Sequence, residues 1–133
     1  MAGESLPAEV TTLLHRALPS MVHIELLLLL ARTAPQAATR YALAQELRSS
    51  PALVAAALDD LQTSGLVQAV PGTEPPEHRF DGSDPVAVRA VAALQEEYDR
   101  RPVTLIKALY SRPASSSIQA FADAFRIRPA GES

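Results

Sequence analysis

The chain has 133 residues, of which 47% are hydrophobic and 20% are charged, and its formal net charge is −3. This length and composition are typical of one globular domain with its own core, and they exclude an intrinsically disordered chain. Because cysteine is absent, disulfides and thiolate metal sites are also excluded. The net charge gives no sign of the overall basic surface that marks many nucleic-acid-binding domains.

The N-terminal part of the sequence predicts two helices in succession. Ser5 is expected to cap the first helix, and Pro19 is expected to end it. Ser20 is then placed to cap a second helix that runs through Arg32. This second helix is apolar on most of its sides, so we expect it to lie at the centre of the core.

The apolar run Ile24–Ala31 within this helix is too short to span a membrane, which takes about 20 apolar residues. The first ten residues contain no basic residue ahead of an apolar core, as a secretory signal would require. We therefore expect a cytoplasmic protein with no membrane contact.

The middle of the sequence alternates helices with short extended pieces. Residues 33–41 are expected to form a loop with room for a very short strand, followed by a helix of two turns over 41–50. Pro51 starts the next helix, and Gly65 is expected to end it in a left-handed conformation. Strands are expected over Leu66–Val70 and His78–Phe80, with a loop rich in turn-forming residues between them.

The C-terminal part of the sequence is again helical. A long helix is expected to begin at Asp84-Pro85, to be interrupted at Pro102, and to resume until Arg112-Pro113. A last helix over 115–125 brings Ile118, Phe121 and Phe125 onto one face, and 129–133 is expected to be a disordered tail.

The segment YALAQELRSSPALVAAALDDLQTSGLV, residues 41–67, resembles the corresponding part of bacterial winged-helix regulators of the MarR type. The resemblance rests on LAQEL, on the serine-rich turn, on GLV after the helix, and on the apolar positions Val54, Leu58 and Leu61. It extends over about residues 20–80 and implies a mainly α fold: a winged helix-turn-helix with a small β-wing and flanking N- and C-terminal helices. The expected organisation is an N-terminal helix over 1–19, the winged helix-turn-helix over 20–82, and C-terminal helices over 83–128 for dimerisation or packing.

Members of this family place the second helix of the motif in the major groove of DNA. By position, the groove-facing residues here would be Pro51, Ala52, Ala55, Ala56 and Asp59, where the family favours hydrogen-bonding side chains. Alanine can offer a base only an apolar contact to a thymine methyl group. The recognition helix is therefore atypical for a DNA-reading protein.

The distribution of charge along the sequence is also atypical for a DNA-binding member of the family. Residues 20–80 contain four basic and six acidic residues, whereas residues 85–128 contain seven basic and four acidic residues. Contacts to phosphate require arginine and lysine, so the basic surface lies outside the module that would bind DNA.

The leading hypothesis from the sequence is a dimeric DNA-binding transcriptional regulator. The alternative is a winged-helix protein-interaction module that docks a partner through Pro51, Ala52, Ala55 and Ala56. The residues expected at DNA, unless they are ordinary solvated loop residues, are Arg40, Tyr41, Ser49, Ser50, Ala52, Ala55, Ala56, His78 and Arg79. The residues expected at a dimer or partner contact, unless they pack within their own domain, are Leu13, Leu14, Leu105, Tyr110, Phe121 and Phe125.

No pattern in the sequence predicts an enzyme, a metal site or a cofactor. His15, His23 and His78 are widely separated and lack a second ligand at metal-binding spacing, so structural roles are expected for them. The adjacent acid pairs at 59–60 and 96–97 diverge on their helices and do not converge on one substrate.

Overall fold

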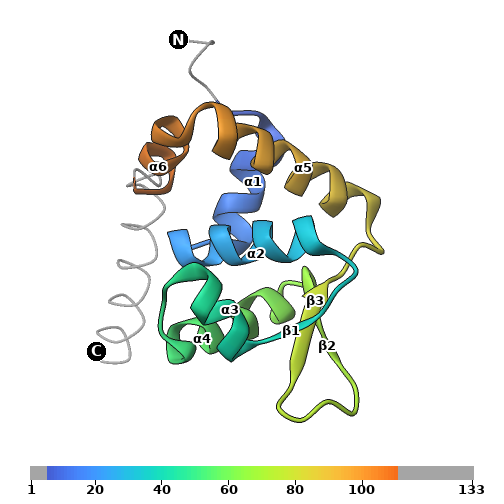
Figure 1. Ribbon diagram of the computed structural model, residues 1–133. Helices are drawn as coiled ribbons and strands as arrows, with labels where there is room; N and C mark the ends of the chain where they lie inside the picture. Colours follow the sequence, from blue (N-terminus) through green and yellow to red (C-terminus); the bar gives the residue numbers. More distant parts are fainter. Residues whose placement is uncertain (1–5, 111–133) are drawn as a thin grey trace, which may run out of the picture.

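The computed structural model describes residues 6–110 of the chain. These residues form six helices and a three-stranded antiparallel sheet of order β1-β3-β2, as predicted for a mainly α winged helix-turn-helix with flanking helices (Figure 1). The elements are α1 (Ala8–Ala17), α2 (Met21–Thr33), β1 (Ala38–Thr39), α3 (Arg40–Leu47), α4 (Pro51–Thr63), β2 (Val67–Val70), β3 (Glu77–Phe80), α5 (Pro85–Arg100) and α6 (Pro102–Tyr110). The predicted cap Ser5, the predicted helix over 115–125 and the predicted tail lie outside the described residues.

Helix α2 lies at the centre of the fold, between the α3–α4 pair on one side and α5 on the other (Figure 1). Its residues Leu26 to Leu30 are all buried, because neighbouring elements surround the helix. The predicted cap is also present, since the Ser20 side chain accepts a hydrogen bond from the backbone N–H of His23. The helix is apolar on most of its sides because other elements surround it at the centre of the fold.

The turn between α3 and α4 has the geometry of a helix-turn-helix. Arg48 ends α3 in the left-handed conformation with φ of 56°, and Ser49 donates its backbone N–H to the Ala44 carbonyl. Ser50 then caps α4 by accepting from the N–H of Leu53, with Pro51 at the first helical position. Helix α3 begins at Arg40, one residue earlier than predicted, and it ends at Leu47, ahead of the two serines that were expected to break it.

The wing follows α4 directly. Gly65 adopts a φ of 82°, as predicted, and leads the chain into β2, which pairs with β3. The short strand β1 pairs with the other edge of β3, so that Ala38 lies opposite His78. The β2–β3 hairpin extends away from the helices, as Figure 1 shows in yellow-green.

Helix α5 packs against α1, α2 and α6. Asp84 caps it by accepting from the N–H of Val86, as the Asp-Pro start predicted. Its buried residues are small at the N-terminal end and larger towards the C-terminal end: Ala87, Ala90, Val91, Leu94 and Glu97. Val86 and Val88 belong to the apolar residues of this sequence segment, yet both are exposed.

Candidate nucleic-acid interface

The outward face of α4 is open and carries small residues. Val54, Ala57, Leu58 and Leu61 of this helix are buried against the core, whereas Pro51, Ala52, Ala56 and Asp59 are exposed and Ala55 is half-buried. Four of the five outward positions have no side chain that can donate or accept a hydrogen bond to a base edge, and the fifth is an anion. The scaffold of a recognition helix is therefore complete, but its outer surface has little capacity for base reading.

Leu53 adds an apolar side chain that the sequence did not single out, and it is 58% exposed. It lies on the side of α4 that also carries Asp60. More than half of this apolar side chain is thus in contact with solvent.

Two residues predicted to contact DNA, Arg40 and Tyr41, form a pair at the start of α3. The Arg40 guanidinium lies 4.9 Å from the centre of the Tyr41 ring, and its Nη2 donates to Tyr41 Oη at 2.9 Å. Both residues are exposed. The pair presents one positive charge whose direction is fixed by the ring.

The two serines of the turn between α3 and α4 differ in their exposure and in the hydrogen bonds that they already make. Ser50 is exposed, but its hydroxyl oxygen already accepts from Leu53 N–H as the cap of α4. Ser49 is half-buried, and its backbone N–H is bound to Ala44. Arg48, which was not among the predicted contacts, is exposed between the two helices because the left-handed turn directs it outward.

His78 and Arg79, two of the residues predicted to contact DNA, are neighbours on β3. Successive residues of a strand point to opposite faces of the sheet. His78 points to the α4 side, where it lines a cavity of about 310 Å³ together with Arg40, Ala55 and Asp59. Arg79, opposite Gln68 in the hairpin, therefore lies on the other face.

Burial controls the ionisation of His78. Its Nδ1 atom is buried and has no hydrogen-bond partner among the described residues. Desolvation lowers the pKa of His78 below its ordinary value of 6.5, and the negative charge of Asp59 opposes that shift. The neutral imidazole is therefore the favoured form in the folded protein.

A second polar cluster escaped the sequence analysis. Ser20 Oγ lies 2.7 Å from His23 Nδ1, and His23 Nε2 lies 2.8 Å from Asp60 Oδ2. The Ser-x-x-His spacing at a helix start signals the first contact, because cap and third residue face each other there. The second contact joins residues 37 positions apart, and only the packing of α2 on α4 reveals it.

The residues predicted at a dimer contact divide into three groups. Leu13, Leu14 and Leu105 are 4%, 1% and 0% exposed, since they belong to the core of the chain itself. These three leucines therefore follow the alternative given with the prediction, packing within their own domain. Tyr110 is 74% exposed, and Phe121 and Phe125 lie outside the described residues.

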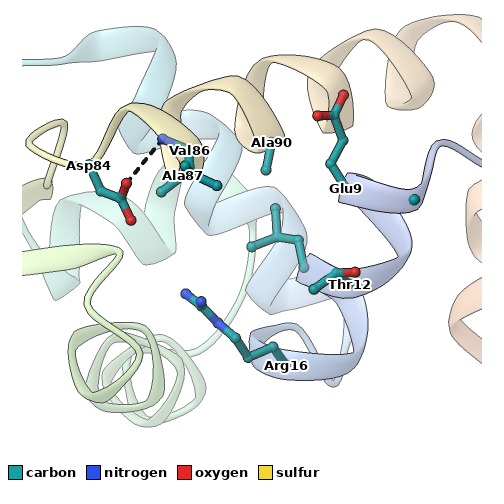
Figure 2. A pocket seen from close by; sticks show the side chains of 9 residues that line it. Glu9, Thr12, Arg16, Asp84, Val86, Ala87 and Ala90 are labelled. Carbon is teal, nitrogen blue, oxygen red and sulfur yellow. Dashed lines mark hydrogen bonds between the residues drawn. The ribbon is translucent and has the colours of Figure 1, made fainter.

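A cavity of about 350 Å³ lies between α1 and α5 (Figure 2). Its apolar lining includes Leu13, Ala87 and Ala90, and charged side chains stand around it at Glu9, Arg16 and Asp84. In Figure 2 the Asp84 carboxylate is bound to the N–H of Val86. The small alanines of α5 create this space, because a larger side chain there would fill it.

Within residues 6–110 no three histidine, aspartate or glutamate residues come close enough together to hold a metal ion. None of the described helices alone is long and apolar enough to cross a membrane; α1 and α2 meet that test only as a pair, across a bend of 114°.

No protein-family model matches the chain, and no curated protein matches it either. Among solved structures, a mutant of Lactococcus lactis ZitR is similar at 23% identity and a TM-score of 0.46, covering 80% of this chain and 72% of that one. A similarity of this extent gives no information about function. The winged-helix assignment rests on the order and pairing of the elements described above.

Proposed function

We propose that the chain is a dimeric winged-helix transcriptional regulator of MarR-like type that binds duplex DNA. The observation that carries this proposal is the open N-terminal half of α4, which the helix-turn-helix and the wing leave exposed at Pro51, Ala52 and Ala56. In winged-helix proteins this end of the recognition helix enters the major groove.

The side chains around α4 determine the kind of DNA contact. Arg40 and Arg48 can reach phosphates from the helix-turn-helix, and Arg79 can do so from the wing. The alanines of α4 can touch thymine methyl groups but cannot distinguish most base pairs. We therefore expect binding dominated by phosphate contacts, with weak discrimination between sequences.

The test is a fluorescence anisotropy titration of a short mixed-sequence duplex at low salt, with the parent protein and the Ala56→Arg variant. Position 56 is exposed on the outward face, so an arginine there adds a cation facing the phosphates. We expect the variant to bind more tightly than the parent. Absence of binding by both proteins at low salt would contradict the proposal.

The exposed Leu53 favours a second candidate, a protein-docking module. Leu53 extends the apolar surface of Ala52 and Ala56, and acidic residues of the same helix, Asp59 and Asp60, border it. This combination suits a partner with an apolar face and a basic edge. The Ala56→Arg variant separates the two candidates, because it would weaken such a partner's binding while strengthening DNA binding.

The homodimer is proposed on the outer face of α6. Val103, Ile106 and Tyr110 follow the i, i+3, i+7 spacing and are all exposed, although Leu105 and Leu109 on the opposite face are buried. A helix that is apolar on two faces needs a second neighbour. We expect light scattering to show a dimer for the parent, a monomer for Ile106→Glu, and a dimer for the control Leu53→Glu. If the parent protein is a monomer, this part of the proposal is wrong.

A further inference from the structure

Ser20, His23 and Asp60 form a continuous chain of hydrogen-bonding groups at the junction of α2 and α4. The two distances are 2.7 Å from Ser20 Oγ to His23 Nδ1 and 2.8 Å from His23 Nε2 to Asp60 Oδ2. The side chain of His23 is 12% exposed, and that of Asp60 is 60% exposed. The imidazole is thus held between a hydroxyl group and a solvated carboxylate.

The direction of the two hydrogen bonds follows from the chemistry of the groups. An ionised carboxylate can only accept, so a neutral His23 must carry its proton on Nε2. The lone pair then resides on Nδ1, and the Ser20 hydroxyl donates to it. A hydroxyl bound to an imidazole that a carboxylate orients is the arrangement that activates a serine as a nucleophile.

The helix start adds a second activating element. Ser20 Oγ accepts from the N–H of His23 at 3.3 Å, as the cap of α2. The N–H groups of the first helical turn have no acceptor within the helix, and they carry the positive end of its dipole. Negative charge that develops on Ser20 Oγ, or on an oxygen bound beside it, is therefore stabilised.

Capping alone does not explain the histidine. Ser50 caps α4 in the same way, and the third residue after it is Leu53. Asp84 caps α5 without any imidazole partner. The imidazole and its carboxylate at Ser20 are additions that the cap does not require.

Space for a reacting group lies next to this cluster. An open cavity of about 340 Å³ is lined by Asp60 and by Pro19, which directly precedes Ser20. Arg16 and Thr63 form other parts of its wall. Ser20 and His23 are not among the residues that line this cavity, so it lies beside the cluster and does not surround the Ser20 hydroxyl group.

We propose that Ser20 is an activated nucleophile that accepts the acyl group of small esters. Ser20 Oγ attacks the ester carbonyl carbon and forms a new C–O bond, while the hydroxyl proton passes to His23 Nδ1. The tetrahedral intermediate then collapses, the bond to the alcohol oxygen breaks, and the leaving alcohol takes the proton from His23. The product is acyl-Ser20, and water attacking it by the same route releases the acid and restores the hydroxyl group.

The test uses p-nitrophenyl acetate with the purified full chain, followed by peptide mapping of the acetylated site. We expect acetylation at Ser20 and none at Ser50, which serves as the internal control because it is a cap without an imidazole. Ser20→Asn should abolish the adduct while keeping the helix capped, since asparagine is as good a cap as serine.

Two further variants, His23→Gln and Asp60→Asn, test whether these residues activate the Ser20 hydroxyl group. Loss of a general base lowers such rates by roughly 100-fold or more, so His23→Gln should slow acetylation of Ser20 by about that factor. Asp60→Asn should slow it less, and Ser83→Ala, which removes a hydroxyl group bound to Asp81, should leave it unchanged. Equal acetylation of Ser20 and Ser50, or an unchanged rate in His23→Gln, would overturn the proposal. Neither result bears on DNA binding, because the nucleophile is independent of the proposed function.

Discussion

The position of His78 in the folded protein disfavours protonation of its imidazole. Its Nδ1 atom is buried without a partner among the described residues, and burial holds its pKa below 6.5, against the opposing charge of Asp59. The unfolded chain therefore binds the proton more readily than the folded protein does. The stability that depends on neutral His78 is complete above a pH of about 6.5 and is lost as the pH falls through the lower pKa of the folded state.

We expect the parent protein to lose more stability than His78→Gln on acidification from about pH 7.5 to about pH 5, the range in which histidine titrates. Urea unfolding of both proteins at each pH measures this difference.

Asp59→Asn should lower the pKa of His78 further, because the carboxylate that favours the imidazolium is gone. Proton NMR of the imidazole follows that shift. Equal losses of stability in parent and His78→Gln would contradict the assignment.

At the scale of single elements, local sequence signals gave correct predictions. Ser20 caps α2 as predicted, helices begin at Pro51 and Pro85 where the sequence placed them, and Gly65 has the positive φ expected of it. Each of these signals acts through a hydrogen bond or a backbone conformation within a few residues. The pairing of the wing strands also followed from local patterns, because the loop between them is short.

Features that depend on packing between elements were not predictable in this way. The sequence named both His78 and Arg79 as DNA contacts, and the alternation of β3 puts them on opposite faces of the sheet. It left open whether Leu13 contacts a partner or packs within its own domain, because a leucine at helical spacing looks the same in a core and at an interface; the side chain is 4% exposed. The contact between His23 and Asp60 needed the crossing of α2 and α4, which no local pattern specifies.

The junction of α5 and α6 depends on one partly buried ion pair. Glu97 is 7% exposed, and its Oε1 accepts from Arg101 Nε at 2.8 Å and lies 2.7 Å from Arg101 Nη2. The backbone of Arg101 also joins the helices, since its N–H donates to the Glu97 carbonyl and its own carbonyl accepts from Leu105. One residue earlier along the chain, Arg100 and Glu96 form an exposed pair at 3.6 Å.

We expect Arg101→Leu to lower the free energy of unfolding by about 2 kcal/mol, because it leaves the Glu97 carboxylate buried without its partner. Arg100→Leu should cost less than about 0.5 kcal/mol, since an exposed pair of this kind contributes little. Urea unfolding of the two variants beside the parent measures both values. A cost for Arg100→Leu equal to that of Arg101→Leu would show that burial of Glu97 is not what makes the pair matter.

At the scale of the whole molecule, the distribution of charge does not favour DNA binding, which is the proposed function. The formal net charge is −3, and residues 20–80 contain more acidic than basic residues. Under the proposed function, contacts to phosphates would therefore have to come from a few arginines, without the help of a basic surface. Arg40 is the best placed of them, because Tyr41 holds its guanidinium beside the cavity that α4 and the wing enclose.

This arrangement predicts a modest dependence of DNA binding on salt. With Arg40, Arg48 and Arg79 each neutralising one phosphate, the logarithm of the binding constant should fall with the logarithm of salt concentration with a slope of roughly −3 per chain. Arg40→Ala should reduce the magnitude of that slope by about 1. Arg79→Ala should reduce it by about the same amount, because Arg79 is counted as one phosphate contact from the wing. Arg89→Ala, which removes an exposed arginine on α5 outside the reading module, should leave the slope unchanged. Anisotropy titrations at several salt concentrations give all four slopes, and an Arg89→Ala slope reduced as much as that of Arg40→Ala would place the DNA on the C-terminal helices instead of on α4.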